Sequence, residues 1–524
     1  MSGFAFKIRN YFLLLSGFAL ALSASVACGQ EKLLEDRWVE LQTEHFTIFS
    51  QMSARQSIRF AEELEAWRKL TARVIDDTES YPKANVPNYV FLFDEEESFS
   101  LFQRNEEAAF FYQTPRGNYM ALNFDEEYSL REAKHYYAHF LIRNFSDLRL
   151  PRWYEEGLAG YLSRVEINRG EPVFSEFSRQ NNIRMAELAA ELSMDRLLYR
   201  DDALASPRVV QIANLKSVAL VHYLKHAHEQ GFPDHRSDLE AYLEYILSGR
   251  AERFAFDMGF PITTEELDDE LFDYLIGASP ETGEVVDSFS VALPDYETSR
   301  MAVVDLATVL GELGLNSGSP SHSEFFFRNL IDSGNPSARS YSGLGDALRF
   351  QAQRDGIEID DQRVAEYFHQ AVNLAPNDVN ILLDYGEYWE AELHDCDKNY
   401  PASQRLQIIA DIESHFEKAI ELAPNNAEAN LALGQVYLFE EQDWRQGVEY
   451  QRHAFLLLPA DSFIMEQSIK YSIAAGEYAE AERLINEMAQ PIHFFGEPDF
   501  VTNLRDRLTS AQQDKSYDEC ADDA

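Results

Sequence analysis

The chain is poor in cysteine and in basic residues, and each shortage excludes a class of protein. Its three cysteines, Cys28, Cys396 and Cys520, are too few and too scattered for a disulfide framework or a cysteine-ligated zinc site. Lys and Arg number 45 against 90 Asp and Glu, which gives a formal net charge of −45. Such a charge repels phosphate backbones and anionic membrane surfaces, and no basic stripe or glycine-rich phosphate loop offsets it. We therefore expect no nucleic-acid partner.

Long apolar runs are also missing after the first residues. Lys7 and Arg9 precede an apolar run from Tyr11 to Leu22, and the small residues at 23–27 are typical of a signal-peptidase site. The run is shorter than the ~20 residues that a membrane-spanning helix needs. We therefore predict a signal peptide at 1–27, no transmembrane segment, and an exported protein that is periplasmic or associated with the outer membrane.

The residues around Cys28 leave lipidation open. Ser25 to Gly29 are similar to a bacterial lipobox, in which the cysteine would carry a lipid anchor, but Ser25 stands where a larger aliphatic residue is usual. The mature protein is thus expected to be either soluble or anchored through Cys28.

Two short segments carry the most chemical information. In "HYYAH", His135 and His139 are four residues apart and fall on one face of a helix. Two imidazoles so placed can fill two tetrahedral positions on Zn²⁺, and Glu156 of "WYEEGLA" is placed to supply the third ligand. In the HExxH pattern, the residue after the first histidine is the glutamate that deprotonates metal-bound water. Here that position holds Tyr136.

These segments resemble the gluzincin zinc peptidases, in particular the bacterial peptidase MA-like family, over roughly residues 36 to 275. The most specific part is "LPRWYEEGLAGYLS" at 150–163, which is similar to the W-x-N-E-G-x-A segment of aminopeptidase-type gluzincins. The resemblance implies one zinc on His135, His139 and Glu156. It also implies a small mixed sheet with a helical subdomain, and Tyr119 to Phe124 as the edge strand. Other matching segments are "RWVELQTEHFTIFS" (37–50), "YVFLFDEEESF" (89–99) and "GNYMALNF" (117–124).

Three positions depart from the family pattern. Tyr136 replaces the catalytic glutamate, and a tyrosine with a pKa of about 10 is a poor proton acceptor near neutral pH. Gly160 stands where an acidic residue often orients a ligand histidine, and Asn214 where relatives tend to have tyrosine. Glu155 is no obvious substitute base, because adjacent helical residues point about 100° apart. A lost general base typically costs on the order of 10²–10⁴-fold in rate.

Other polar residues near the two segments have plainer interpretations. Glu132 and His222 are expected to be a solvated helix residue or a packed polar core group rather than ligands. Ser217 has no paired histidine or acid at a readable spacing, so nucleophilic catalysis is not predicted.

After about residue 297 the chain changes to helical repeats. Three segments share an alanine five residues before a proline, and Gly345, Gly386 and Gly434 occupy a small position upstream. This resembles the tetratricopeptide repeat, in which small residues allow close helix crossing and the proline ends the second helix. The prolines, Pro376, Pro424 and Pro459, are 48 and 35 residues apart against a period of about 34, so the first interval holds an insertion around 396–405, as a longer loop or longer helices. Weaker units are expected at 299–333 and 469–488.

Stacked repeats of this kind form a concave surface that usually binds a peptide or protein. Tyr385, Trp389, Tyr437 and Trp444 are expected in the repeat core rather than on that surface. The fold class is therefore α+β, gluzincin-like, followed by an all-α tetratricopeptide-repeat solenoid. The predicted domains are a signal peptide (1–27), the peptidase-like domain (28–290), the repeats (297–495) and a C-terminal segment with a disordered acidic tail (496–524).

Three functions follow from these patterns. The favoured one is an exported zinc-site protein that binds polypeptide, has weakened or lost hydrolysis, and recruits a protein partner through its repeats. The first alternative is an active zinc metallopeptidase that uses an unusual base. The second is a metal-free scaffold for the repeats.

Overall fold

The computed structural model describes the chain in two compact units. The described residues are 29–103, 107–124, 128–145, 150–168, 171–174, 179–199, 206–277, 289, 294–396, 398–439, 441–489, 499–513 and 515. Unit 1 takes its described residues from Met1–Ile58, Pro87–Ser129 and Tyr296–Ala432, and unit 2 from Arg59–Val86, Leu130–Asp295 and Leu433–Ala524. The predicted signal peptide, Cys28 and nearly all of the predicted acidic tail lie outside the described residues. The predicted domain boundaries stay a prediction.

Within the described residues, unit 1 is built on a six-stranded mixed sheet with the order β4-β5-β3-β2-β1-β8. β2, β3 and β5 run parallel, whereas β1, β4 and β8 are antiparallel to their neighbours. The strands are β1 (Val39–Gln42), β2 (Thr47–Ser50), β3 (Asn88–Phe93), β4 (Ala109–Thr114), β5 (Gly117–Asn123) and β8 (Thr298–Arg300), with the short helix α3 (Glu96–Phe99) after β3.

The position of β5 corrects the edge-strand prediction. β5 pairs with β3 on one side and with β4 on the other, and all seven of its residues are buried. A tight turn at Pro115 and Arg116 joins β4 to β5, with Thr114 opposite Gly117, so β4 folds back as the edge strand. The resemblance gave the strand before the histidine helix as the edge, but the hairpin covers it.

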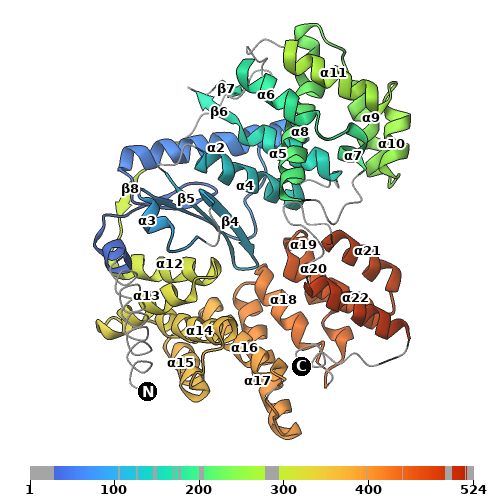
Figure 1. The fold of residues 1–524 in the computed structure, drawn as a ribbon. Helices are drawn as coiled ribbons and strands as arrows, with labels where there is room; N and C mark the ends of the chain where they lie inside the picture. The colour runs from blue at the N-terminus through green and yellow to red at the C-terminus, as the bar shows by residue number, and fades with distance from the viewer. Residues whose placement is uncertain are drawn as a thin grey trace, which may run out of the picture. The chain divides into compact units, whose positions relative to one another are not determined.

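One aromatic core joins this sheet to the first helix pair. Side chains from β2, β3, β4 and β5 pack against α12 (Val303–Asn316) and α13 (Pro320–Asp332), which Figure 1 shows beside the sheet. Phe102 stacks on Phe326 with ring centroids 6.3 Å apart, and Leu310 and Leu313 complete the contact. The weak opening unit predicted at 299–333 is therefore a true helix pair.

The helices that follow in unit 1 form consecutive pairs. They are α14 (Ala338–Asp355), α15 (Asp361–Leu374), α16 (Val379–His394) and α17 (Ala402–Leu422). Gly345 and Gly386 lie against the rings of Phe368 and Phe416 on the next helix, which confirms the predicted close packing. The predicted insertion is a longer helix, because α17 has 21 residues. α18 (Ala427–Val436) begins in unit 1 and ends in unit 2.

Unit 2 is almost entirely helical. It holds α2 (Ala54–Asp76, from Arg59 on), α4 (Ser129–Phe145, from Leu130 on), α5 (Arg152–Ser163), the hairpin β6 (Val165–Asn168) and β7 (Glu171–Phe174), α6 (Arg179–Ala189), α7 (Met194–Leu198), α8 (Pro207–His226), η1 (Ala227–Gln230), α9 (Arg236–Leu247), α10 (Glu252–Gly259) and α11 (Thr264–Gly277). Its C-terminal part holds η2 (Trp444–Gln446), α19 (Val448–Leu457), α20 (Ser462–Ala475), α21 (Tyr478–Met488) and α22 (Asp499–Gln512). The predicted final unit at 469–488 corresponds to the pair α20 and α21.

The fold is thus a mixed α/β N-terminal region followed by a largely helical repeat region. Tyr385 and Trp389 belong to the core between α15 and α16 and Tyr437 is buried, as predicted, whereas Trp444 is only partly buried. No helix in the described part of the chain is both long and apolar enough to cross a membrane.

Candidate metal centre

Helix α4 presents the two predicted histidines to the same point in unit 2. His135 and His139 lie one turn apart, with ring centroids 4.9 Å apart and ring planes at 82°. His139 is buried, whereas His135 is partly exposed. The i, i+4 spacing therefore places both histidines on the same face of α4, as predicted.

Helix α5 supplies the carboxylate between them. Glu156 is buried, with Oε1 3.4 Å from His135 Nε2 and Oε2 3.4 Å from His139 Nε2. One ligand atom from each of the three residues lies within 4.8 Å of the others. The structure thus brings together the three residues predicted as a metal site.

The donor set and its spacing fit a tetrahedral ion. Two imidazole nitrogens and a carboxylate oxygen are the ligands of many catalytic zinc sites, with bonds of about 2.0–2.1 Å. Ligand atoms at that radius around a tetrahedral centre lie about 3.3 Å from one another. The two 3.4 Å separations, each to a different oxygen of Glu156, are close to this spacing. The buried group can therefore hold a metal ion such as zinc.

Glu155 is the site residue that the sequence reasoning missed. Its Oε1 lies 2.9 Å from His139 Nδ1 and accepts a hydrogen bond from Arg143 Nε at 2.7 Å. Burial opposes its negative charge, but the hydrogen bond to His139 and the charge of Arg143 lower the pKa of Glu155 to about 2. A ligand histidine needs such an acceptor at its other ring nitrogen to fix its tautomer and orientation. The acidic pair "EE" in the sequence was the available signal.

The electrostatics of the two histidines differ. Burial lowers the pKa of His135 despite the nearby carboxylate of Glu156, so its imidazole favours the neutral form that binds metal. For His139, burial is outweighed by hydrogen bonds to Glu155 and Glu156, which raise its pKa. The same contacts hold the pKa of Glu156 well below its usual range, against the effect of burial.

Close packing of α5 on α8 explains the glycine at position 160. A Cβ on Gly160 would lie 2.3 Å from Val218 Cγ2, and one on Gly157 would lie 2.5 Å from the carbonyl oxygen of Ser217. No acidic side chain fits at position 160 while α8 stays in place. Glu155, on the same helix, supplies a carboxylate to His139.

Three further residues named in the sequence analysis, Tyr136, Asn214 and His222, lie on α4 and α8. Tyr136 is partly exposed on α4, with its ring edge-on to His135 at 5.8 Å between centroids. Asn214 lies on α8, one turn before Ser217 and Val218, the residues that contact α5. His222 is buried and bonds to the Tyr274 hydroxyl through Nδ1 at 2.9 Å, so its interpretation as a packed core group is confirmed.

No family model and no curated protein matches this chain. Among solved structures it is similar to a thermophilic TPR protein from Thermus thermophilus, at 15% identity over 40% of this chain and 99% of that chain, with a TM-score of 0.31. It is also similar to PilF of Pseudomonas aeruginosa, at 17% identity over 40% of this chain and 85% of that chain, with a TM-score of 0.30. TM-scores this low carry no argument of their own, so the repeat assignment depends on the helix pairs described above. The gluzincin resemblance stays a prediction.

Proposed function

We propose that this chain is an exported protein with a zinc site of the gluzincin kind, that it binds polypeptide with weakened or lost hydrolysis, and that its repeats recruit a protein partner. The observation that carries the proposal is the convergence of His135, His139 and Glu156 beside a tyrosine at the position of the general base. A third ligand and an oriented histidine argue for metal binding, whereas Tyr136 argues against efficient proton transfer.

Each residue of the candidate metal site has a distinct proposed role. His135, His139 and Glu156 would hold the ion, and Glu155 fixes the ring of His139 through Nδ1. Bound zinc supplies Lewis acidity and lowers the pKa of a coordinated water. Tyr136 is expected to be a poor proton acceptor near neutral pH, because an ordinary tyrosine has a pKa of about 10. Polypeptide would therefore bind near the metal and leave largely uncut.

Export is the proposed location. The predicted signal peptide motivates it, and Cys396 takes part in a disulfide, a bond that persists in oxidising compartments such as the periplasm. Fractionation of cells that express the full chain tests this, because a cytoplasmic protein of uncleaved mass would contradict export. Radiolabelled palmitate incorporation, compared between wild type and Cys28→Ser, decides between a lipid anchor and a soluble protein.

Zinc analysis of the purified chain tests the metal site. We expect about one zinc per wild-type chain, and loss of that zinc in His139→Ala and in Glu156→Gln. His394→Ala is the matched control, because His394 is exposed at the end of α16 and should leave the zinc content unchanged. Wild-type protein without zinc after incubation with the metal would support the metal-free scaffold instead.

Peptide libraries test the lost hydrolysis. Wild type should cleave far more slowly than ordinary metallopeptidases, and Tyr136→Glu should raise chelator-sensitive cleavage by up to about 10²–10⁴-fold, the usual effect of a general base. The oriented His139 favours the active-enzyme alternative. Robust cleavage by wild type that His139→Ala abolishes would establish that alternative and reject ours.

A further inference from the structure

The turn of the β4–β5 hairpin carries an arginine that reaches the repeat helices of unit 1. Arg116 lies between Pro115 and Gly117, and Thr114 Oγ1 closes the turn by donating to the Gly117 carbonyl at 2.9 Å. The hairpin and the helices it meets all belong to unit 1. A side chain on so short a turn has its direction set by the two strands.

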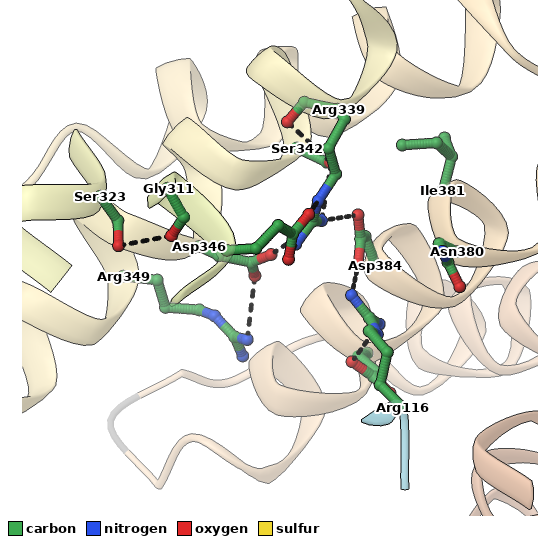
Figure 2. A network of polar contacts seen from close by, with 12 residues as sticks. Arg116, Gly311, Ser323, Arg339, Ser342, Asp346, Arg349, Asn380, Ile381 and Asp384 are labelled. Atoms are coloured by element: carbon green, nitrogen blue, oxygen red, sulfur yellow. Dashed lines mark hydrogen bonds and ion pairs between the residues drawn. The ribbon is translucent and has the colours of Figure 1, made fainter. Parts of the chain in front are cut away.

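Arg116 is bound by carboxylates of two repeat helices. Its Nε donates to both oxygens of Glu428 at 3.0 Å, its Nη2 donates to Glu428 Oε1 at 2.7 Å, and its Nη1 donates to Asp384 Oδ1 at 2.7 Å. Figure 2 shows Arg116 pointing at Asp384. Glu387 lies further off, with an oxygen 3.7 Å from Nη2. The planar fork of a guanidinium suits this two-sided contact, and a lysine could not reproduce it.

These carboxylates belong to a larger acidic cluster on alternate helices. We define the acidic cluster as Glu312 of α12, Asp346 of α14, Asp384 and Glu387 of α16, and Glu428 of α18. α12, α14 and α16 are the first helices of successive pairs, so the acidic cluster follows one row of helices in the repeats. Within the repeats, Arg339 also contacts Glu312. Figure 2 shows the contacts of Arg339 with Asp384 and of Arg349 with Asp346.

The acidic cluster carries more charge than the repeats themselves neutralise. Its five carboxylates meet two arginines of the repeat helices, Arg339 and Arg349. Burial and neighbouring carboxylates raise the pKa of Asp346 to about 6 and that of Glu387 well above its usual range. Asp384 is only 1% exposed and therefore cannot be solvated if its cationic partners leave. The cluster needs a further cation, and a distant segment of the chain provides it.

We propose that Arg116 is an intramolecular ligand of the repeats, and that a polypeptide presenting an arginine on a similarly tight turn competes with it for the acidic cluster. Arg116 thus keeps the acidic cluster closed to arginine-bearing partners until the hairpin is displaced. The proposal deepens the partner-binding role of the repeats proposed above. It does not depend on the metal centre.

A peptide with the sequence of residues 111–120, labelled with fluorescein, tests the proposal on the full chain. Fluorescence anisotropy should detect binding to Arg116→Ala, at least 10-fold tighter than to wild type, because the acidic cluster then lacks its intramolecular arginine. Binding should fall at least 10-fold when the arginine of the peptide is replaced by citrulline, which keeps the shape and removes the charge. It should fall likewise in the double variant Arg116→Ala, Asp384→Asn.

Equal binding to wild type and Arg116→Ala, or no loss with the citrulline peptide, would overturn the proposal. Circular dichroism first establishes that each variant is folded. If Arg116→Ala is not, Arg116→Lys replaces it, since lysine keeps a charge without the fork, and the same order of affinities is expected. Zinc content, measured in parallel, should equal that of wild type, so that failure of the arginine contact is distinguished from failure of the proposed metal site.

Discussion

Glu155 and Glu156 are neighbours in the chain, but their carboxylates meet different nitrogens of His139. Glu156 lies at the Nε2 side, where it would share an ion, and Glu155 lies at the Nδ1 side, where it orients the ring. The adjacent positions are about 100° apart on α5, yet both side chains reach the same histidine. The angle between adjacent helical residues made Glu155 no obvious substitute base. That angle does not predict the contact of Glu155 with His139 Nδ1.

We predict that Glu155→Gln weakens zinc binding by about 10–100-fold, the usual effect of removing a partner that orients a ligand histidine. The amide still fills the space but no longer carries the charge that favours the bound imidazole. Competition with a fluorescent chelator gives the affinity. Arg143→Gln is the matched control, because it removes the other partner of Glu155 and should have the smaller effect. Unchanged affinity in Glu155→Gln would show that His139 is oriented by other contacts.

His322 of α13 gives a prediction about pH in unit 1. Its Nδ1 lies 2.6 Å from Gln30 Nε2, its ring lies beside that of Phe102, and burial together with the charge of Arg354 lowers its pKa to about 4. The unfolded chain takes up this proton near 6.5, whereas the folded chain does so only near 4. The free energy of unfolding should therefore fall by about 2–3 kcal/mol as the pH drops through this window.

The measurement is urea unfolding of wild type and His322→Gln between pH 7.5 and 4. The difference between the two should shift in favour of His322→Gln as the pH falls, because the other acidic groups cancel in the comparison. His394→Gln, at an exposed site, is the matched control for the replacement of histidine by glutamine. A constant difference for His322→Gln as well would contradict the burial argument.

At the scale of helices, two repeat glycines that look alike in the sequence have different surroundings. A Cβ on Gly386 would lie 2.2 Å from the buried ring of Phe416, whereas on Gly434 its nearest neighbour would be a Gln451 backbone atom at 3.6 Å. The repeat pattern predicts a small residue at both positions. Only the packing in the structure shows that a methyl group would clash at Gly386 and not at Gly434.

We predict that Gly386→Ala destabilises the chain by about 1–3 kcal/mol, since it forces a methyl group into a packed core. Gly434→Ala should be neutral or gain up to about 1 kcal/mol, because alanine is the better helix former and the space is free. Chemical unfolding of both variants gives the comparison. Equal destabilisation of the two would mean that the packing at Gly386 relaxes at little cost.

The sequence patterns indicated where several strands and helices lie, but they did not indicate which strands pair in the sheet. The family-like segments at 37–50, 89–99 and 117–124 overlap β1, β2, β3 and β5, and the i, i+4 histidines with the "WYEEGLA" segment indicated the candidate metal centre. The order of the sheet escaped prediction because β4, β5 and β8 meet their partners through turns and a long return of the chain, which local patterns do not encode. Arg116 escaped for the same reason, as its carboxylate partners lie 268 and 312 residues further along the chain.

At the scale of the whole molecule, the main electrostatic feature is the excess of acidic over basic residues. A formal net charge of −45 makes self-repulsion a cost of folding, and the described ion pairs neutralise only part of it. The Debye length shrinks from about 30 Å at 0.01 M salt to about 3 Å at 1 M, so added salt screens this repulsion.

We predict that the melting temperature rises between 0.01 M and 1 M NaCl, by roughly 1 °C for each kcal/mol gained, because the entropy of unfolding scales with chain length. Choline chloride should act in the same way, which separates screening from sodium binding. A melting temperature that is flat or falls with salt would show that repulsion is already balanced by local ion pairs.

The interleaving of the two units has a consequence for how the chain is made. Each unit draws on three separate stretches of sequence, and unit 1 is complete only when Ala432 has been reached. Neither unit can therefore finish folding while the chain is still being synthesised or translocated through its middle. If the protein is exported as proposed, neither unit can be completed until most of the chain has been translocated. A single proteolytic cut anywhere between the stretches would damage a unit instead of releasing one.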